Sequence, residues 1–132
     1  MTSRKYPPTI AHLHQIILFV RAELVAISRF NESQIQKIEL AVEEVIVNII
    51  EHSQMSQDDF IEVNCRESIA GQGIEIVIRD SGIPYDPTSP QQQKNESEGC
   101  GLRLLFTIMD RVSYRRDGFY NELTLFFNAS LG

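Results

Sequence analysis

The first half of the chain carries apolar residues at helical spacing. Over about residues 9–29 one face is apolar, with members recurring every three or four positions at Leu13, Ile16, Ile17, Val20, Leu24 and Ile27. Residues 33–52 show the same period, and Asn31 followed three positions later by Gln34 resembles an N-cap box at their start. The pattern therefore predicts two consecutive amphipathic helices.

The second half changes to the two-residue period of β-strands. Apolar residues alternate with polar ones at Ile61, Val63 and Cys65, and again at Ile74, Ile76 and Ile78. A short helix is expected over residues 102–110. The dipeptide Asp117-Gly118 is a strong hairpin signal, and it joins strands that we expect over residues 112–116 and 119–127.

The order of these elements is two helices, two strands, a loop, a helix and two strands. It predicts an α+β fold, a two-layer sandwich whose helices pack on one face of a mainly antiparallel, mixed sheet. A length of 132 residues suits one domain, so we expect residues 1–132 to fold as a unit. Residues 88–98 are polar almost throughout, which is typical of a lid or binding loop.

Composition narrows the classes of function. The formal net charge of −6 disfavours broad, non-specific binding to nucleic acid. The two cysteines, Cys65 and Cys100, are too far apart for a zinc knuckle or a redox pair, and the three histidines show no metal-binding spacing. No signal peptide and no unbroken apolar run near the ~20 residues that cross a bilayer are seen. We therefore expect a cytoplasmic protein that binds neither nucleic acid nor a membrane.

The second predicted helix carries a polar stripe opposite its apolar face. Glu44, Asn48 and His52 are spaced four residues apart and form one ladder about 12 Å long. The simplest interpretation is the solvated face of an amphipathic helix. A carboxylate with a neutral amide one turn later can also hold a hydrated Mg²⁺ and orient a hydroxyl. The stripe by itself leaves both interpretations open.

Asp80 ends the second predicted strand, and Gly82 permits a tight turn directly after it. One interpretation is a simple loop in which Asp80 only forms the turn. The other places Asp80 at a pocket, where its oxygens accept a hydrogen bond from an exocyclic amine such as that of adenine.

A pair of glycines, Gly99 and Gly101, flanks Cys100 and leads through Leu102 into the predicted short helix. Glycines at the start of a helix let backbone N–H groups approach an anion. They also occur as plain hinges, and the segment is neither a P-loop nor a Rossmann fingerprint. Cys100 is interpreted as a small spacer.

These three motifs, in this order and spacing, resemble the GHKL ATP-binding superfamily. More closely, they resemble the anti-sigma-factor serine/threonine protein kinases of bacterial partner-switching systems. The N-box of that family, Glu-x-x-x-Asn-x-x-x-His, is matched by LAVEEVIVNIIEHS at residues 40–53. Its Asp-x-Gly box is matched by RDSGIPYDP at 79–87, and its second glycine box by EGCGLRLLFTIMDRVSY at 98–114. The resemblance covers about residues 9–127 and implies the histidine-kinase-like ATPase fold.

The resemblance also implies ATP and Mg²⁺ as cofactors and assigns them residues. Glu44 would be the general base that activates the attacking hydroxyl, and Asn48 would ligate the Mg²⁺ that bridges the ATP phosphates. Asp80 would bind the adenine amino group, with close access for the base at Gly82. His52 would have a structural or supporting role.

The remaining implied roles lie in the second half of the chain. Gly99, Gly101 and Leu102 would form the phosphate-binding segment, and residues 88–98 the ATP lid. Many members of the family support the adenine-binding aspartate with a threonine on the last strand. Thr124 is the nearest candidate, but the sequence does not fix the register of that strand.

The function implied by the family is that of an ATP-dependent serine/threonine protein kinase. It would phosphorylate an anti-sigma-factor antagonist protein and sequester a regulatory partner such as a sigma factor. The alternative is a non-catalytic ATP-binding module that holds such a partner. Two further alternatives are the ATPase half of a sensor histidine kinase and a domain that binds no nucleotide. The habit of the family also leads us to expect a homodimer.

Overall fold

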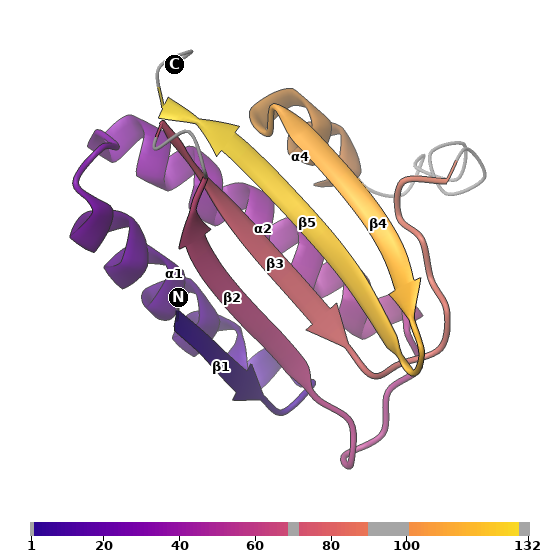
Figure 1. Cartoon of the computed structure of the whole chain (residues 1–132). Helices are drawn as coiled ribbons and strands as arrows, with labels where there is room; N and C mark the ends of the chain where they lie inside the picture. The colour runs from indigo at the N-terminus through magenta and orange to yellow at the C-terminus, as the bar shows by residue number, and fades with distance from the viewer. Residues whose placement is uncertain (1, 69–71, 90–100, 130–132) are drawn as a thin grey trace.

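The computed structural model describes residues 2–68, 72–89 and 101–129. Figure 1 shows the path of the chain through its helices and strands. In chain order they are β1 (Thr2–Tyr6), η1 (Ile10–His12), α1 (Leu13–Ile27), α2 (Glu32–His52), β2 (Ile61–Glu67), β3 (Gly73–Asp80), α4 (Gly101–Ile108), β4 (Arg111–Asp117) and β5 (Tyr120–Asn128).

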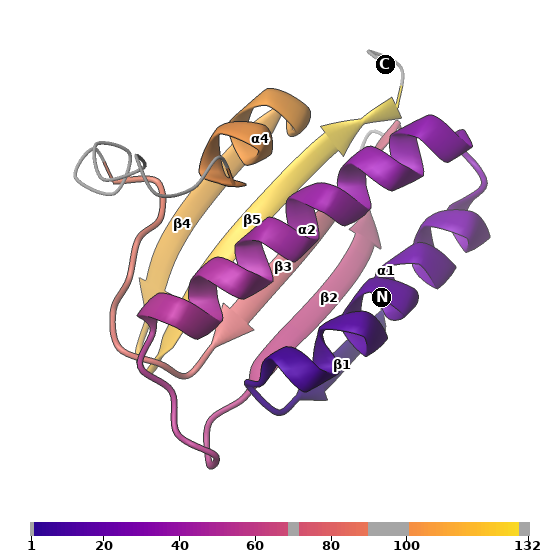
Figure 2. The same ribbon diagram turned by 180° about the vertical axis from the view of Figure 1, so that it is seen from behind.

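The strands form one five-stranded sheet in the order β1-β2-β3-β5-β4. The helices α1, α2 and α4 all lie on one face of this sheet, as Figure 2 shows from behind. Two layers result, because the apolar face of the sheet and the apolar faces of the helices can be buried only against each other. The predicted two-layer α+β fold is confirmed.

The sheet is antiparallel at every pairing of the described strands, whereas a mixed sheet was expected. The position of β5 explains the difference. After the β4 hairpin, β5 lies between β3 and β4 and pairs with both. The two strands that run in the same direction, β3 and β4, are therefore separated and do not pair.

The strand β1 has no counterpart among the sequence predictions. Its residues, TSRKY, are short and mostly polar, so they carry no clear alternation. It becomes a strand through its neighbour, because it pairs with β2 at the edge of the sheet, from Thr2 opposite Cys65 to Tyr6 opposite Ile61. The contact that defines it is therefore distant in sequence.

The core lies between the sheet and the helices. Helical residues at the predicted 3.6-residue period point inward, and so do alternate residues of the strands. The fully buried members include Ile16, Val20, Leu24, Ile38, Val42 and Ile46 from the helices and Ile61, Val63, Ile74, Ile76, Ile78 and Leu125 from the strands. The hydrophobic periodicity read from the sequence is thus confirmed in both halves.

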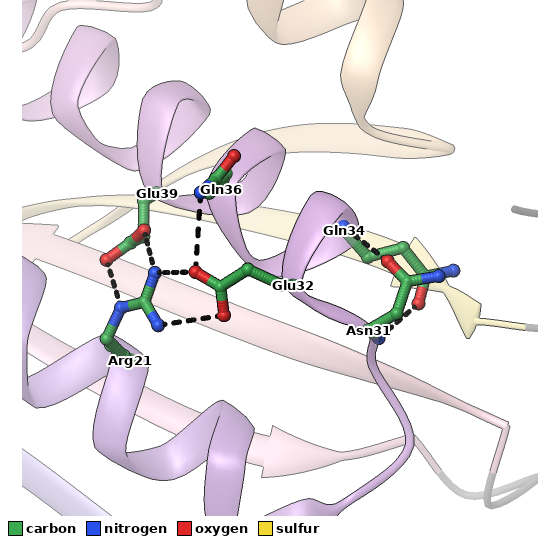
Figure 3. A network of polar contacts seen from close by, with 6 residues as sticks. All are labelled: Arg21, Asn31, Glu32, Gln34, Gln36 and Glu39. Atoms are coloured by element: carbon green, nitrogen blue, oxygen red, sulfur yellow. Dashed lines mark hydrogen bonds and ion pairs between the residues drawn. The ribbon is translucent and has the colours of Figure 1, made fainter.

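The start of α2 is fixed by two sets of polar contacts, both drawn in Figure 3. The side chain of Asn31 accepts a hydrogen bond from Gln34 N at 2.8 Å, and Gln34 Oε1 accepts one from Asn31 N at 2.9 Å. This reciprocal pair is the predicted N-cap box, which satisfies backbone donors at the helix start. Arg21 of α1 joins the helices, since its Nη2 donates to Glu32 at 2.7 Å and to Glu39 at 2.9 Å.

One segment of the described residues, Ile10–Ile27, is long and apolar enough by length and composition to cross a membrane. Polar residues interrupt this segment, so it contains no unbroken apolar run near the length of a span. Its inner face packs in the core through Ile16 and Val20, while Leu18 and Val25 are about half exposed on its outer face. One such helix is weak grounds for a membrane span, and here it is an amphipathic layer of the sandwich.

We predict that Asn31→Ala lowers the free energy of unfolding by about 1 kcal/mol, because it removes the side-chain acceptor of the N-cap box. Urea denaturation followed by circular dichroism measures this loss. Asn31→Ser is the matched control, because serine caps helices nearly as well as asparagine and should restore most of the stability. Equal losses in the two variants would show that the cap does not contribute through its acceptor oxygen.

Candidate functional site

Three elements meet at one end of the molecule. The carboxyl end of β3, the start of β5 and the C-terminal end of α2 lie together in both ribbon views (Figures 1 and 2). Asp80 is the last residue of β3 and lies directly opposite Asn121 of β5 in the strand register. The loop that follows Asp80 passes beneath the end of α2, where Ile83 N donates to Ser53 O at 2.9 Å.

Asp80 is buried, with only 1% of its surface exposed. Its Oδ1 accepts hydrogen bonds from Asn121 Nδ2 at 2.9 Å and from Gly82 N at 3.0 Å. Burial raises the pKa of the Asp80 carboxyl above its ordinary value, although the bonds from Asn121 and Gly82 oppose the shift. Both bonds reach Oδ1, so the second oxygen has acceptor capacity for an amine on a ligand.

Gly82 and Ser53 pack directly against each other. A Cβ on Gly82 would lie 2.4 Å from Ser53 O and 2.6 Å from Ser53 Cβ, so only glycine fits here. Ser53 is completely buried, and its hydroxyl is close enough to Asp80 to lower the pKa of that carboxyl slightly. The hydroxyl nevertheless makes no hydrogen bond of ordinary geometry. A buried hydroxyl without a partner beside a buried carboxylate suits a polar ligand such as a nucleotide base.

Asn121 is a site residue that the sequence analysis missed. Its Nδ2 also donates to Ile83 O at 2.7 Å, and its Oδ1 accepts from Tyr85 N at 3.1 Å and from the Tyr114 hydroxyl. One side chain therefore holds Asp80 and two positions of the loop after it. The sequence did contain one sign of this role. Asn121 is a polar residue in the alternating series of β5 positions that face the core, which continues with Leu123, Leu125 and Phe127.

Thr124, the sequence candidate for supporting Asp80, lies elsewhere. It pairs with Val77 and with Ser113, three positions along β5 from Asn121. Three residues along a strand also reverse the face, so Thr124 lies on the side of the sheet opposite to Asn121. The sequence did not determine the register of β5, and in the structure the residue that supports Asp80 is Asn121.

The polar stripe of α2 divides into an exposed part and a half-buried part. Glu44 and Asn48 are half-buried, whereas His52 is exposed, as are two further polar residues on this side of the helix, Lys37 and Glu51. Burial raises the pKa of the Glu44 carboxyl, with a smaller contribution from the negative charge of Glu43. The solvated-face interpretation thus holds for only part of the stripe.

Asn48 is in direct contact with the loop that follows β3. Its Oδ1 accepts a hydrogen bond from the Tyr85 hydroxyl at 2.6 Å, and the ring of Tyr85 stacks on His52 with centroids 5.2 Å apart. The contacts therefore run without a break from Asp80 through Asn121 and Tyr85 to Asn48. An amide oxygen at this position can serve as one ligand of a Mg²⁺ that takes its other ligands from phosphates and water.

Part of the expected phosphate-binding segment is outside the described residues. Gly99 and Cys100 are not described, and neither are residues 90–98 of the expected lid. Gly101 and Leu102 begin α4, which confirms a helix at this point. At the start of the expected lid, Thr88 bonds to Asp86 through both its backbone N and its hydroxyl.

The chain is similar to proteins of a known family. The family model described as the histidine kinase-like ATPase domain matches residues 6–127. The serine-protein kinase RsbW of Bacillus licheniformis is 30% identical over 111 residues, which cover 75% of this chain and 69% of that protein. The serine-protein kinase RsbW of Bacillus cereus is 25% identical over 122 residues, which cover 83% of this chain and 74% of that protein.

Solved structures show the same fold. The structure of the RsbU and RsbW domains of a Mycobacterium tuberculosis protein matches 97% of this chain with a TM-score of 0.65 at 14% identity. This chain spans about a third of that longer one, 32%. The histidine kinase domain of a blue-light activated histidine kinase from Erythrobacter litoralis matches 74% of this chain, and 45% of its own, with a TM-score of 0.55 at 18% identity. The chain belongs to the histidine kinase-like ATPase domain family and, within it, to the anti-sigma-factor serine-protein kinases of the RsbW type.

Proposed function

We propose that the protein is an ATP-dependent serine/threonine protein kinase of the cytoplasm that phosphorylates an anti-sigma-factor antagonist and sequesters a partner such as a sigma factor. One observation supports the site above all. The buried acid Asp80 and the half-buried amide Asn48 come from different elements, yet they are joined through Asn121 and Tyr85. This continuity supports assigning the group suited to the base and the group suited to the metal to one site.

The base-binding end has the properties that adenine requires. Asp80 accepts a hydrogen bond from the exocyclic amine. The unpartnered hydroxyl of Ser53, which is buried beside Asp80, supplies a further polar contact. Gly82 keeps the loop close to the end of α2, since any larger residue would collide with Ser53. Gly99, Gly101 and Leu102 complete the proposal as the segment that approaches the phosphates.

Phosphoryl transfer depends mainly on positioning and on neutralising charge, which Mg²⁺ supplies when it is bound with ATP. Asn48 would supply one ligand of that metal through its amide oxygen. Glu44 lies one helical turn before Asn48 and accepts the proton of the attacking serine or threonine hydroxyl. Its raised pKa makes it a stronger base than an exposed glutamate, which favours this role.

The proposed partners follow from the same family. They are an antagonist protein as substrate, a sigma factor and a second copy of the chain. The outer face of α1 exposes Leu18 and Val25, which offer apolar surface for a protein contact. Sedimentation analysis of the purified protein distinguishes a dimer from a monomer.

A non-catalytic ATP-binding module is the second candidate function. The observation that favours it is the hydrogen bond that engages Asn48 Oδ1, since this is the atom that a metal would need. Formation of a partner complex with ATP bound and no transfer of phosphate would support this candidate.

We predict that Asp80→Asn weakens ATP binding at least about tenfold, because an amide nitrogen replaces an acceptor oxygen of the base site. Isothermal titration calorimetry with Mg²⁺ and ATP measures the change. Asp117→Asn in the β4–β5 hairpin is the matched control, because it removes an exposed acid outside the site. Unaltered affinity in Asp80→Asn would remove the adenine contact from the proposal.

The same variant should be more stable than the wild type in the absence of ligand. The pKa of Asp80 is raised in the folded protein, so the wild type loses stability as pH rises from the ordinary aspartate range through the raised value. Asparagine avoids this cost and retains an Oδ1 for both hydrogen bonds. We therefore expect thermal unfolding to show a higher midpoint for Asp80→Asn at pH 7, and the gain should shrink as the pH is lowered. A lower midpoint at pH 7 would contradict this account.

We predict that Glu44→Gln lowers the rate of phosphate transfer by about 10²- to 10⁴-fold, because it removes the general base, and leaves ATP affinity unchanged. Transfer of ³²P from ATP to the antagonist protein measures the rate. The wild-type rate should rise with pH through the raised pKa of Glu44, since only the ionised carboxylate accepts a proton.

The neighbouring acid gives the matched control. Glu43→Gln removes an exposed negative charge that raises the pKa of Glu44, so the variant should stay active with its pH profile shifted to lower pH. If Glu44→Gln and Glu43→Gln had the same rates and the same profiles, Glu44 would not be the base.

A further inference from the structure

Tyr85 is held on three sides within the site. Its hydroxyl donates a hydrogen bond to Asn48 Oδ1 at 2.6 Å, and its backbone N–H donates to Asn121 Oδ1 at 3.1 Å. Its ring stacks on His52, with the two planes inclined by 21°. The loop after β3 is thus attached both to the last strand and to the polar stripe of α2 through one residue.

The bond to Asn48 uses the atom that a metal would need. The carboxamide of asparagine has one acceptor atom, Oδ1, because its nitrogen only donates, so a hydrogen bond and a metal at Asn48 would share the two lone pairs of the same oxygen. A Mg²⁺ ligand must offer that oxygen at about 2.0–2.1 Å. When a hydroxyl proton points at this oxygen, the oxygen has less electron density to offer a cation. The proton also brings positive charge toward the metal position.

We propose that Tyr85 is a positioning residue that occupies the metal-binding oxygen of Asn48 in the nucleotide-free protein and yields it when Mg²⁺ and ATP bind. This inference rests on the proposed function and adds a regulatory step to its site. The exchange is local: the Tyr85 hydroxyl leaves Asn48 Oδ1 and donates its hydrogen bond to water instead, which the half-buried positions of both residues allow.

The contacts of the ring and the backbone separate this role from simple packing. The stack on His52 and the bond from Tyr85 N to Asn121 do not involve the hydroxyl. Tyr85→Phe therefore removes the hydrogen bond to Asn48 and preserves the ring stack and the backbone bond. A residue that only shaped the loop would affect ATP binding equally with and without the metal.

The experiment measures the affinity for ATP by calorimetry, once with Mg²⁺ and once with EDTA. In EDTA, Tyr85→Phe should bind ATP as the wild type does. With Mg²⁺ the variant should bind about 2- to 10-fold more tightly, because the metal no longer displaces a hydrogen bond of ordinary strength. A near-ultraviolet difference spectrum gives a second readout. The wild type should show a tyrosine signal when Mg²⁺ is added to the ATP complex, and the variant should lack it.

Tyr114→Phe is the matched control. It also removes a half-buried tyrosine hydroxyl that donates to an asparagine of the site, but the acceptor is Asn121 rather than Asn48. Any change in its ATP affinity should be the same with Mg²⁺ and with EDTA.

Three results would overturn the inference. Weaker Mg²⁺-dependent binding by Tyr85→Phe would show that the hydroxyl orients Asn48 for the metal rather than competing with it. Equal changes with Mg²⁺ and with EDTA would show a role in the loop alone. Unchanged affinity in both buffers would show that the hydrogen bond has no part in metal binding. If the wild type binds no ATP in either buffer, the proposed function itself fails, and this outcome is distinct from the other three.

Discussion

The hydrogen bond between Asn121 and the buried carboxylate of Asp80 is the contact on which the site depends. It crosses from β3 to β5 at a point where the strand register places the two residues directly opposite each other. A buried carboxylate is unfavourable unless its oxygens are satisfied, and here the same amide also fixes the loop that leads to Tyr85. Asp80, the turn at Gly82 and the contact with α2 are therefore organised by one side chain of the last strand.

The layers of the fold could be predicted because their signals are local. The 3.6-residue period, the N-cap box at Asn31 and the turn at Asp117-Gly118 each lie within a short stretch of sequence, and the structure contains all three. The strand β1 and the pairing of β5 with β3 could not be predicted in the same way. Both are fixed by pairing with residues far away in the chain, and the propensities of their own residues do not determine that pairing.

In the candidate site, too, the residues in local motifs could be predicted and those defined by distant contacts could not. Glu44, Asn48, Asp80 and Gly82 stand in motifs whose spacing is visible in the sequence. Asn121 and Tyr85 were missed, since their importance comes from what they touch. A polar residue in the inward register of an otherwise apolar strand was the one visible sign of Asn121. The hydroxyl of Tyr85 carries no such sign, because a loop tyrosine is ordinary until its partner is known.

The position of β5 in the sheet determines when the contact between Asp80 and Asn121 can form during synthesis. Asp80 and Asn121 are 41 positions apart, and Asn121 belongs to β5, the last of the described strands. During synthesis, a ribosome-bound chain that has emerged only as far as β4 therefore lacks the partner that holds Asp80. A ligand that binds only the completed site stabilises the chain with its last strand docked. Any ligand that the proposed site binds would therefore stabilise the chain only after β5 has paired with β3.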